Sequence, residues 1–313
     1  MSEKKKSIFA IFSYIVLFAV IFVSTFTIIS QNDIGISEIN DSETVETLTG
    51  TEFKHQEYIE TIDGFYVGDI FEDKFNGIGQ FEFLTNEIYV GEWNDSTLQG
   101  EGVMYFPSVG EYSGNYYDFK RSGTGTFTWD DGDTYTGNWN HDKIDGEGIY
   151  TFSNGSYLEG TFKENKFVSG KYCVSDDTST YVLSIENSAF TNNAEITKNT
   201  GEKYTGSIKN GKPDGYGSFT YKNGATYVGN FADGKRSGTG TYTWKSGEKY
   251  TGAWKDDNMS GEGTYYYSSG NYPKLTGSFS NNAPTGTCKY YKYSYEYYTT
   301  TWQNGKCIRV AED

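Results

Sequence analysis

Cysteine, proline and histidine are scarce in this chain, and aliphatic residues are sparse after its first thirty positions. The 313 residues include three cysteines, four prolines and two histidines. Three cysteines, Cys173, Cys288 and Cys307, are too few and odd in number for a disulfide framework. We expect three unpaired thiols, although Cys288 and Cys307 lie close enough in the sequence to pair. The histidines, His55 and His141, offer neither a Ser/His/Asp arrangement nor a metal-ligand set.

Other signatures of catalysis are also missing. No Walker or Rossmann loop occurs, because the Gly-x-Gly pairs lie in stretches that alternate as strands do. With 42 acidic residues, two facing carboxylates that mimic a glycosidase pair are expected by chance. The acidic turn Asp130-Asp131-Gly132-Asp133 could hold Ca²⁺ weakly, but an ordinary turn is the simpler interpretation. The sequence therefore predicts a protein that is not an enzyme, with no cofactor and no metal.

Positive charge is in deficit. The formal net charge is −16, and because residues 1–30 hold three lysines and one glutamate, the remainder carries −18. Such a balance repels nucleic acid and anionic lipid surfaces at long range. We therefore expect no nucleic-acid partner.

An apolar run near the N-terminus predicts a membrane segment. Ile8 to Ile29 contains no charged residue and follows Lys4, Lys5 and Lys6. As a helix it would cover roughly 33 Å, enough to cross a hydrocarbon core of about 30 Å. A cleaved signal peptide is the alternative, but its apolar region is normally shorter and ends at a small-x-small site. We favour an uncleaved signal anchor.

Flanking charges predict the orientation of this anchor. The lysines before the span place the short N-terminal tail in the cytoplasm and the remainder of the chain outside it. Residues 31–57 are acidic and poor in rings, which is typical of a flexible stalk. The predicted organisation is a cytoplasmic tail and anchor at 1–30, the stalk at 31–57, and a repeat region at 58–313, in a single-pass membrane protein.

A 23-residue repeat fills that last region. Counting in steps of 23 from Tyr66 and allowing a two-residue insertion near Tyr272 gives eleven units, which begin at Tyr66, Tyr89, Tyr112, Tyr135, Leu158, Tyr181, Tyr204, Tyr227, Tyr250, Leu275 and Tyr298. A unit contains Tyr-x-Gly-x-Trp/Phe, a polar turn, Gly-x-Gly-x-aromatic-x-aromatic and a second turn. Alternation with period two predicts strands with rings and glycines on one face.

Glycine within these strands has a physical explanation. It leaves room for a neighbouring ring to lie flat over the backbone. Turn pairs such as Asp233-Gly234 supply positive φ, and one hairpin cannot bury its rings alone, so units must stack. The predicted fold is an all-β elongated ribbon of stacked antiparallel β-hairpins behind one transmembrane α-helix. Its predicted structural residues are Tyr66, Gly68, Tyr89, Gly91, Trp93, Tyr112, Gly114, Tyr135, Gly137, Trp139, Tyr204, Gly206, Tyr227, Gly229, Tyr250, Gly252 and Trp254.

This pattern resembles the MORN (membrane occupation and recognition nexus) repeat from about Tyr66 to Lys306. The resemblance implies an elongated all-β ribbon with interaction and scaffolding roles, sometimes beside a separate catalytic domain. Acidic-lipid binding is attributed to the family, but the charge of this chain argues against it here. Many members are cytoplasmic, which differs from the topology that the flanking charges predict.

Two units depart from the pattern. The unit 158–180 has Ser169 and Lys171 where glycine is expected, and the unit 181–203 keeps little beyond Tyr181 and Gly201. These departures predict a bend, or a division into two blocks at 66–157 and 204–310.

A lysine often stands eight residues after the first position of a unit. Seven units have it, and in a stacked ribbon these lysines would form a row along one edge, with Arg121 and Arg236 beside it. The row could bind an anionic polymer or an acidic partner. The simpler interpretation is that lysine suits an exposed turn and protects a sheet edge from pairing. The lysines are Lys74, Lys120, Lys143, Lys166, Lys212, Lys235 and Lys306.

The rings have two interpretations. The first-position tyrosines and the Trp or Phe four residues later are expected to form the core. Surplus rings near the C-terminus are the best candidates for exposure, or they cap the last hairpin: Tyr290, Tyr291, Tyr293, Tyr295, Tyr297 and Tyr298. We therefore expect a membrane-anchored interaction scaffold that binds an unknown protein. The alternative is a glycan or cell-envelope polymer bound through exposed aromatic rows. Open sheet edges would also permit a homodimer.

Overall fold

The computed structural model describes residues 37–38 and 57–312, and every helix or strand assigned within them is a strand. The all-β prediction is therefore confirmed for this part of the chain. The predicted anchor and most of the predicted stalk lie outside the described residues. Among the residues that are described, no helix is long and apolar enough to cross a membrane.

The chain divides into two compact units. The first ends at Tyr172 and also includes Ile185–Ala189, and the second consists of Cys173–Ser184 and the residues from Phe190 onward. The boundary falls in the degenerate stretch, whose strands β12 (Lys166–Ser175) and β13 (Ser179–Glu186) contribute to both units. Because these strands form despite the missing glycines, the degenerate units still adopt the extended backbone of the others.

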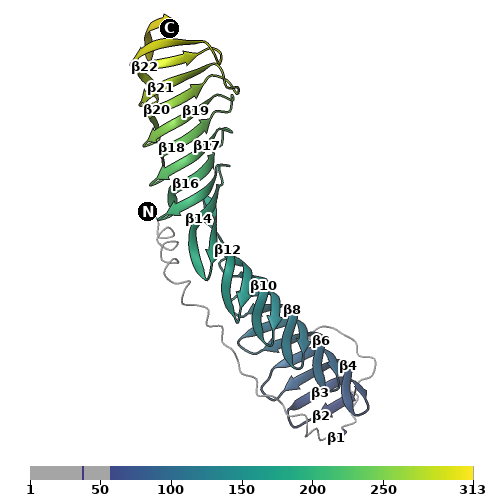
Figure 1. Ribbon diagram of the computed structural model, residues 1–313. Helices are drawn as coiled ribbons and strands as arrows, with labels where there is room; N and C mark the ends of the chain where they lie inside the picture. The colour runs from purple at the N-terminus through teal and green to yellow at the C-terminus, as the bar shows by residue number, and fades with distance from the viewer. Residues whose placement is uncertain (1–36, 39–56, 313) are drawn as a thin grey trace. The chain divides into compact units, whose positions relative to one another are not determined.

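In the first unit consecutive strands form antiparallel hairpins in chain order (Figure 1). Its strands are β1 (Ser37–Glu38), β2 (Glu57–Glu60), β3 (Gly64–Phe71), β4 (Lys74–Phe83), β5 (Ile88–Asn94), β6 (Thr97–Phe106), β7 (Gly110–Tyr117), β8 (Lys120–Trp129), β9 (Thr134–Asn140), β10 (Lys143–Thr151) and β11 (Tyr157–Lys163).

The second unit repeats the arrangement. Its strands are β14 (Ala189–Lys198), β15 (Lys203–Lys209), β16 (Lys212–Thr220), β17 (Thr226–Ala232), β18 (Lys235–Thr243), β19 (Lys249–Lys255), β20 (Asn258–Tyr266), β21 (Lys274–Ser280), β22 (Ala283–Tyr291), β23 (Tyr297–Gln303) and β24 (Lys306–Glu312). Each of these strands pairs antiparallel with the next.

Two faces of the sheet can be distinguished in each unit. The first-position tyrosines lie on one face, which we call the ring face, and seven of the nine are buried, whereas Tyr181 and Tyr298 are half-buried. Residues directly before and after each of these tyrosines point to the opposite face, which we call the outer face, because side chains alternate along a strand. The core of each unit is therefore a layer of aromatic side chains on the ring face.

Opposed glycines make room for those rings. Gly68 of β3 faces Gly79 of β4 in the register of the hairpin. A methyl group added at Gly79 would lie 2.4 Å from the hydroxyl oxygen and the ring edge of Tyr66. The Tyr66 hydroxyl in turn donates to the carbonyl oxygen of Asp69 at 2.8 Å. The predicted packing of a flat ring over glycine is thus confirmed, and the ring also satisfies its one polar atom.

Hairpin turns of two residues join the two strands of each repeat. Both turn residues have positive φ, for example 51° at Asp95 and 63° at Ser96. This is the signature of the type I′ turn, whose twist matches that of the flanking strands. We expected glycine to supply these angles, as in Asp233-Gly234, yet most of the turns use Asp, Asn, Glu, Ser or His instead.

Candidate interaction surfaces

The turns carry the predicted row of lysines. Four of the seven lysines form an ion pair with an acidic turn residue of the next repeat. Lys74 lies 3.2 Å from Asp95, and Lys212 lies 2.7 Å from Asp233. The other pairs join Lys143 to Glu164 and Lys235 to Asp256. Among the described residues no ion pair is made by Lys120, Lys166 or Lys306.

This pairing favours the structural interpretation of the row. A turn acid in the next repeat offsets the charge of each of the four paired lysines, so the row is a series of neutralised contacts between repeats. The pairs are more than 40% exposed on both sides. Exposed pairs contribute little to stability, typically below about 1 kcal/mol. A strongly cationic surface for an anionic partner is therefore absent from the paired part of this edge.

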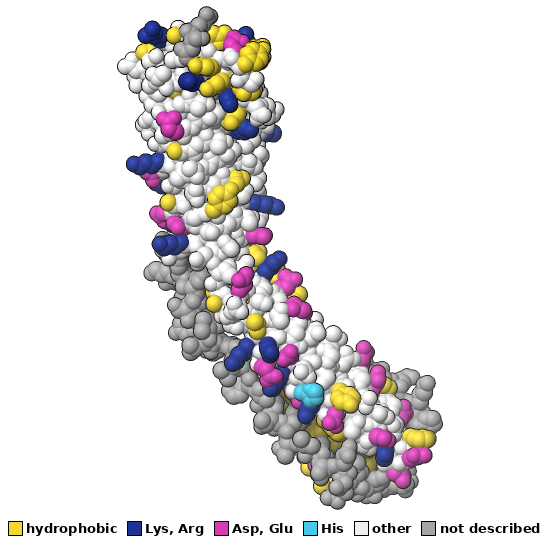
Figure 2. Space-filling model, in the orientation of Figure 1, with side chains coloured by type: hydrophobic (Ala, Val, Ile, Leu, Met, Phe, Trp, Pro, Cys, Tyr) yellow, Lys and Arg dark blue, Asp and Glu magenta, His cyan; other side chains and the backbone are white. Residues whose placement is uncertain are grey.

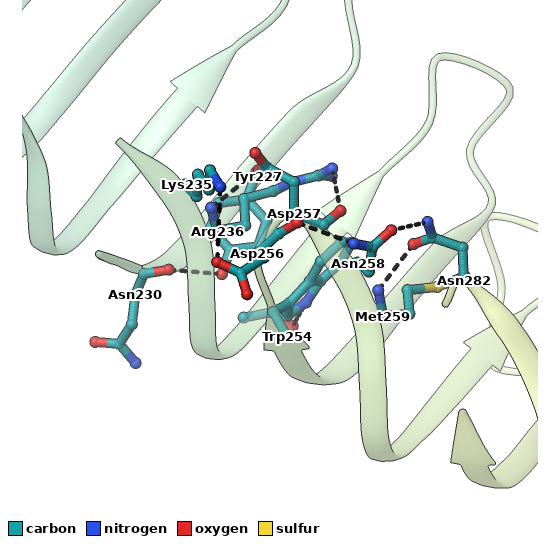
Figure 3. A network of polar contacts seen from close by, with 11 residues as sticks. Tyr227, Asn230, Lys235, Arg236, Trp254, Asp256, Asp257, Asn258, Met259 and Asn282 are labelled. Atoms are coloured by element: carbon teal, nitrogen blue, oxygen red, sulfur yellow. Dashed lines mark hydrogen bonds and ion pairs between the residues drawn. The ribbon is translucent and has the colours of Figure 1, made fainter. Parts of the chain in front are cut away.

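Two arginines beside the row make stronger contacts. The guanidinium of Arg236 donates to Asp257 Oδ1 at 3.0 Å and to the Asp257 carbonyl oxygen at 2.7 Å. It also lies over the ring of Trp254, 4.4 Å from the ring centroid (Figure 3). Both the bidentate contact and the stacking require the planar shape of arginine. The arginine side chain is only 18% exposed, whereas that of Asp257 is 49% exposed.

The same cluster occurs in the first unit. Arg121 donates to Asp142 at 3.1 Å and lies 4.6 Å from the ring centroid of Trp139. Sequence reasoning placed Arg121 and Arg236 beside the lysine row but missed their stacking. A signal was available, because the heptapeptide Lys-Arg-Ser-Gly-Thr-Gly-Thr occurs at both 120–126 and 235–241, each followed by a tryptophan 18 residues after the arginine.

Rings on the ring face interlock between repeats. Trp254 packs edge-to-face against both Tyr227 and Tyr250, at centroid distances of 5.3 Å. Its indole nitrogen donates to the carbonyl oxygen of Gly240 in the preceding repeat at 3.1 Å. Trp93 and Trp139 make the same hydrogen bond in the first unit. The interpretation of these rings as core is confirmed, and they leave no free aromatic row along this stretch of the ring face.

Burial of the tyrosine rings also raises the pKa of their hydroxyl groups. Desolvation raises the pKa of Tyr250 to about 12, and the nearby carboxylate of Glu262 acts in the same direction. Burial raises the pKa of Tyr135 to about 12 as well, despite the opposing hydrogen bond to the Asn138 backbone. The phenols therefore stay protonated at neutral pH and serve as hydrogen-bond donors, not as acids or bases.

The last repeat differs from the others on the ring face. Thr300 occupies the position that glycine holds elsewhere, and its hydroxyl donates to the carbonyl oxygen of Cys288 at 3.0 Å. The Tyr298 hydroxyl donates to Glu296 at 2.7 Å instead of to a backbone carbonyl three residues later. A hollow of about 480 Å³ results, lined by Tyr267, Tyr290, Tyr298, Thr300, Trp302, Cys307 and Val310.

The surplus C-terminal tyrosines are only partly exposed. Tyr295 is 85% and Tyr293 48% exposed. The other four, Tyr290, Tyr291, Tyr297 and Tyr298, are half-buried. Exposure is therefore confined to the loop that joins β22 to β23. The hollow on the ring face and the tyrosines of the outer face are distinct surfaces at this end of the second unit.

The remaining candidate groups take structural roles. Asp133, in the acidic turn, accepts a hydrogen bond from the Tyr150 hydroxyl at 2.6 Å. The three cysteines are free thiols, and Cys307 alone among them is exposed. No cluster of three potential metal ligands occurs in the described part of the chain. His141 is a turn residue whose imidazole lies beside the side chain of Asn140.

Comparison with known proteins agrees with this geometry. A family model described as MORN repeat matches six segments, at 89–108, 112–134, 135–157, 204–226, 227–249 and 250–272. No curated protein matches the chain. The unit that begins at Tyr66 lies outside the matched segments but makes the same tyrosine-to-backbone hydrogen bond as its neighbours. Three matched segments lie on each side of the degenerate stretch, and the chain therefore carries MORN repeats in both of its compact units.

Proposed function

We propose that this chain is a non-catalytic interaction scaffold that is anchored in a membrane by its N-terminal segment and displays its MORN repeats outside the cytoplasm. One observation carries the scaffold part of the proposal. In the matched repeats, hydrogen bonds from ring-face tyrosines and tryptophans to backbone carbonyl oxygens recur from repeat to repeat, as in Tyr227 to Asn230 and Trp254 to Gly240. Such periodic structure favours a partner surface over a reaction site.

The anchor and topology rest on the apolar run Ile8–Ile29 and on the lysines that precede it. Protease treatment of intact cells, with an epitope at the C-terminus, tests them. Loss of the epitope is expected if the repeats lie outside the cell. Protection until the membrane is opened would overturn the topology, and the repeats would then serve intracellular partners.

Binding to a protein partner can be tested by photo-cross-linking in intact cells. Tyr117 and Tyr216 are 59% and 63% exposed, one in each unit, and can be replaced by a photoreactive residue. We expect discrete adducts of defined mass at one or both positions. The same two variants without irradiation are the negative control, and an adduct with a second copy of the chain would identify a homodimer. Absence of any adduct at exposed positions would contradict the scaffold proposal.

A second candidate function is glycan binding. It is favoured by one specific observation: on the outer face of β19 to β22, Lys249 faces Tyr266 and Lys274 faces Tyr291. Soluble polymers added to the purified chain would give a calorimetric signal if this function holds, and a signal is not expected from a scaffold that binds protein alone.

A further inference from the structure

Lysine and tyrosine alternate on the outer face at the C-terminal end of the second unit. Lys249 of β19 faces Tyr266 of β20, which faces Lys274 of β21, and Lys274 faces Tyr291 of β22. Tyr291 then faces Tyr297 of β23. These residues form one line across five neighbouring strands, and we call this line the Lys/Tyr row.

The members of the row contact one another. The Lys249 ammonium lies 4.4 Å from the ring centroid of Tyr266, and the Lys274 ammonium lies 5.1 Å from that of Tyr291. Lys289, in the adjacent position on β22, lies 4.5 Å from the centroid of Tyr297 and is itself exposed. Lys274 also lies 5.0 Å from the ring centroid of Tyr272, so these cation–π contacts place the lysines beside the rings. Lys249 and Lys274 are half-buried. None of the three lysines forms an ion pair with a described carboxylate.

Local charge differs sharply from that of the whole chain. Residues 263–311 contain five basic residues and one acidic residue, Glu296, although the chain carries −16 overall. Figure 2 shows apolar and basic side chains gathered at this end of the second unit, where acidic ones are sparse. Glu262, further along β20 on the outer face, accepts a hydrogen bond from Ser278.

The first unit lacks such a row at the equivalent positions. There the aligned residues include Glu82, Ile88, Tyr105 and Glu111 on β4 to β7, with acidic side chains and no lysine. Repeat geometry alone therefore does not require lysine and tyrosine on this line. Their alternation is a property of the C-terminal repeats.

We infer that the Lys/Tyr row binds an acidic polysaccharide in which an acidic sugar alternates with a neutral one. This inference rests on the second candidate function, glycan binding, and specifies its ligand and its site. Successive strands lie about 4.8 Å apart, so Lys249 and Lys274 are roughly 10 Å apart along the row with a ring between them. Ammonium groups would meet carboxylates or sulfates, and the tyrosines would supply aromatic faces to the intervening sugars.

The alternation of lysine and tyrosine also favours this ligand over other polyanions. Nucleic acids and anionic membranes present charge at every unit or over a whole surface. The first four positions of the row alternate lysine and a neutral ring, which matches a polymer whose charge is equally interrupted. The tyrosine hydroxyls add hydrogen-bonding groups suited to sugar hydroxyls.

Binding of hyaluronate oligosaccharides to the full chain in detergent, measured by isothermal titration calorimetry, tests the inference. We expect saturable binding that weakens as salt is raised. The double variant Lys274→Ala/Lys289→Ala should bind at least about tenfold more weakly, as should Tyr266→Ala/Tyr291→Ala. The matched control Lys212→Ala/Lys235→Ala removes the same charge from the turn edge of the same unit and should bind like the unchanged chain. Circular dichroism of each variant establishes that it is folded.

The outcomes separate this inference from the proposed function. Binding of neutral chitin oligosaccharides as tightly as hyaluronate would retain glycan binding but overturn the assignment of an acidic ligand. Equal or tighter binding of single-stranded DNA or of vesicles containing phosphatidylglycerol would overturn it in favour of a general polyanion surface. If the control variant Lys212→Ala/Lys235→Ala loses as much affinity for hyaluronate as the row variants do, the effect is due to net charge. That result would overturn the row as the binding site. No binding to any polymer would reject glycan binding altogether and leave the protein scaffold to the cross-linking experiment.

Discussion

At the residue scale, seven of the repeats depend on the fit of one phenol ring over two glycines. These repeats begin at Tyr66, Tyr89, Tyr112, Tyr135, Tyr204, Tyr227 and Tyr250. A methyl group added at Gly240 would lie 2.2 Å from the Tyr227 hydroxyl oxygen and 2.5 Å from its ring. Because Tyr227 is fully buried, the ring has no free space into which it can move. We expect Gly240→Ala to lower the free energy of unfolding by about 2–3 kcal/mol through overpacking. Urea denaturation followed by tryptophan fluorescence measures the change.

The same unit offers a matched control for that substitution. Gly270 lies in the loop before β21, where an added methyl group would make only ordinary contacts at 3.6 Å or more. Gly270→Ala should therefore change the free energy of unfolding by less than about 0.5 kcal/mol. If both variants lose the same stability, the close approach of ring and glycine is not what makes Gly240 necessary.

The arginine cluster allows a second prediction at this scale. Arg236→Lys keeps the charge but loses the two-point contact with Asp257 and the planar stacking on Trp254. We expect this substitution to lower the free energy of unfolding by about 1–2 kcal/mol. Lys235→Ala, which breaks the neighbouring exposed pair with Asp256 at 3.7 Å, should cost less than about 0.5 kcal/mol. Thermal or urea unfolding that ranks the two variants the other way would contradict the shape requirement.

At the scale of the hairpin, turn residues do more than reverse the chain. Asn165 has φ of 63°, and its side-chain oxygen accepts a hydrogen bond from the backbone nitrogen of Ile144 in the preceding repeat at 2.8 Å. Asp142, Asp257 and Asn282 make equivalent bonds. Glycine at such a position would keep the turn angle and lose the bond to the neighbouring repeat. This explains why side-chain-bearing residues prevail where glycine is expected.

That double role can be separated by two substitutions. Asn165→Gly should lower the free energy of unfolding by about 1 kcal/mol, because it removes one hydrogen bond but tolerates positive φ. Asn165→Ala also strains the backbone and should lose about 1 kcal/mol more. Equal losses in the two variants, measured by urea denaturation, would mean that the positive φ contributes nothing to the preference for Asn.

How far the sequence predicts these elements depends on the range of the interaction involved. The strands, their period and the ring-over-glycine packing follow from short-range alternation, so Tyr66, Gly68 and Gly79 are predictable from spacing alone. Contacts between repeats are not predictable from spacing alone. The Lys235 to Asp256 pair, the stacking of Arg236 on Trp254 and the facing of Lys249 with Tyr266 and of Lys274 with Tyr291 each need the register of neighbouring strands. In these contacts the register relates residues 17 to 21 positions apart.

At the scale of the whole molecule, the buried tyrosines predict that the folded chain loses stability as the pH becomes alkaline. Burial raises the pKa of Tyr135, Tyr204 and Tyr250 to about 12 in the folded chain. In the unfolded chain a tyrosine titrates near 10, so the unfolded state releases its protons first as the pH rises. The stabilisation is fully present below about pH 10 and is lost as the pH rises toward about 12, by up to about 1.4 kcal/mol per pH unit for each tyrosine.

Urea denaturation at about pH 9 and about pH 11 measures this loss. Tyr250→Phe should reduce the difference between the two values, because phenylalanine cannot ionise, although it loses the hydrogen bond to the Ala253 carbonyl. A free energy of unfolding that stays constant between these pH values would show that the tyrosines already titrate near 10 in the folded chain.

Nearest-neighbour packing predicts how damage spreads through the molecule. In both units the contacts that hold a repeat come from its own hairpin and from the adjacent ones, so stability should behave as a sum of local terms. Gly125→Ala places a methyl group 2.2 Å from the Tyr112 hydroxyl in the first unit, just as Gly240→Ala does against Tyr227 in the second. Hydrogen exchange of the Gly125→Ala chain should show reduced protection in β7 to β9 and unchanged protection in β17 to β20, with the reverse for Gly240→Ala. Loss of protection throughout both units in either variant would show that the repeats unfold together as one cooperative body. The free energies of unfolding predicted above would then describe the unfolding of the whole repeat region.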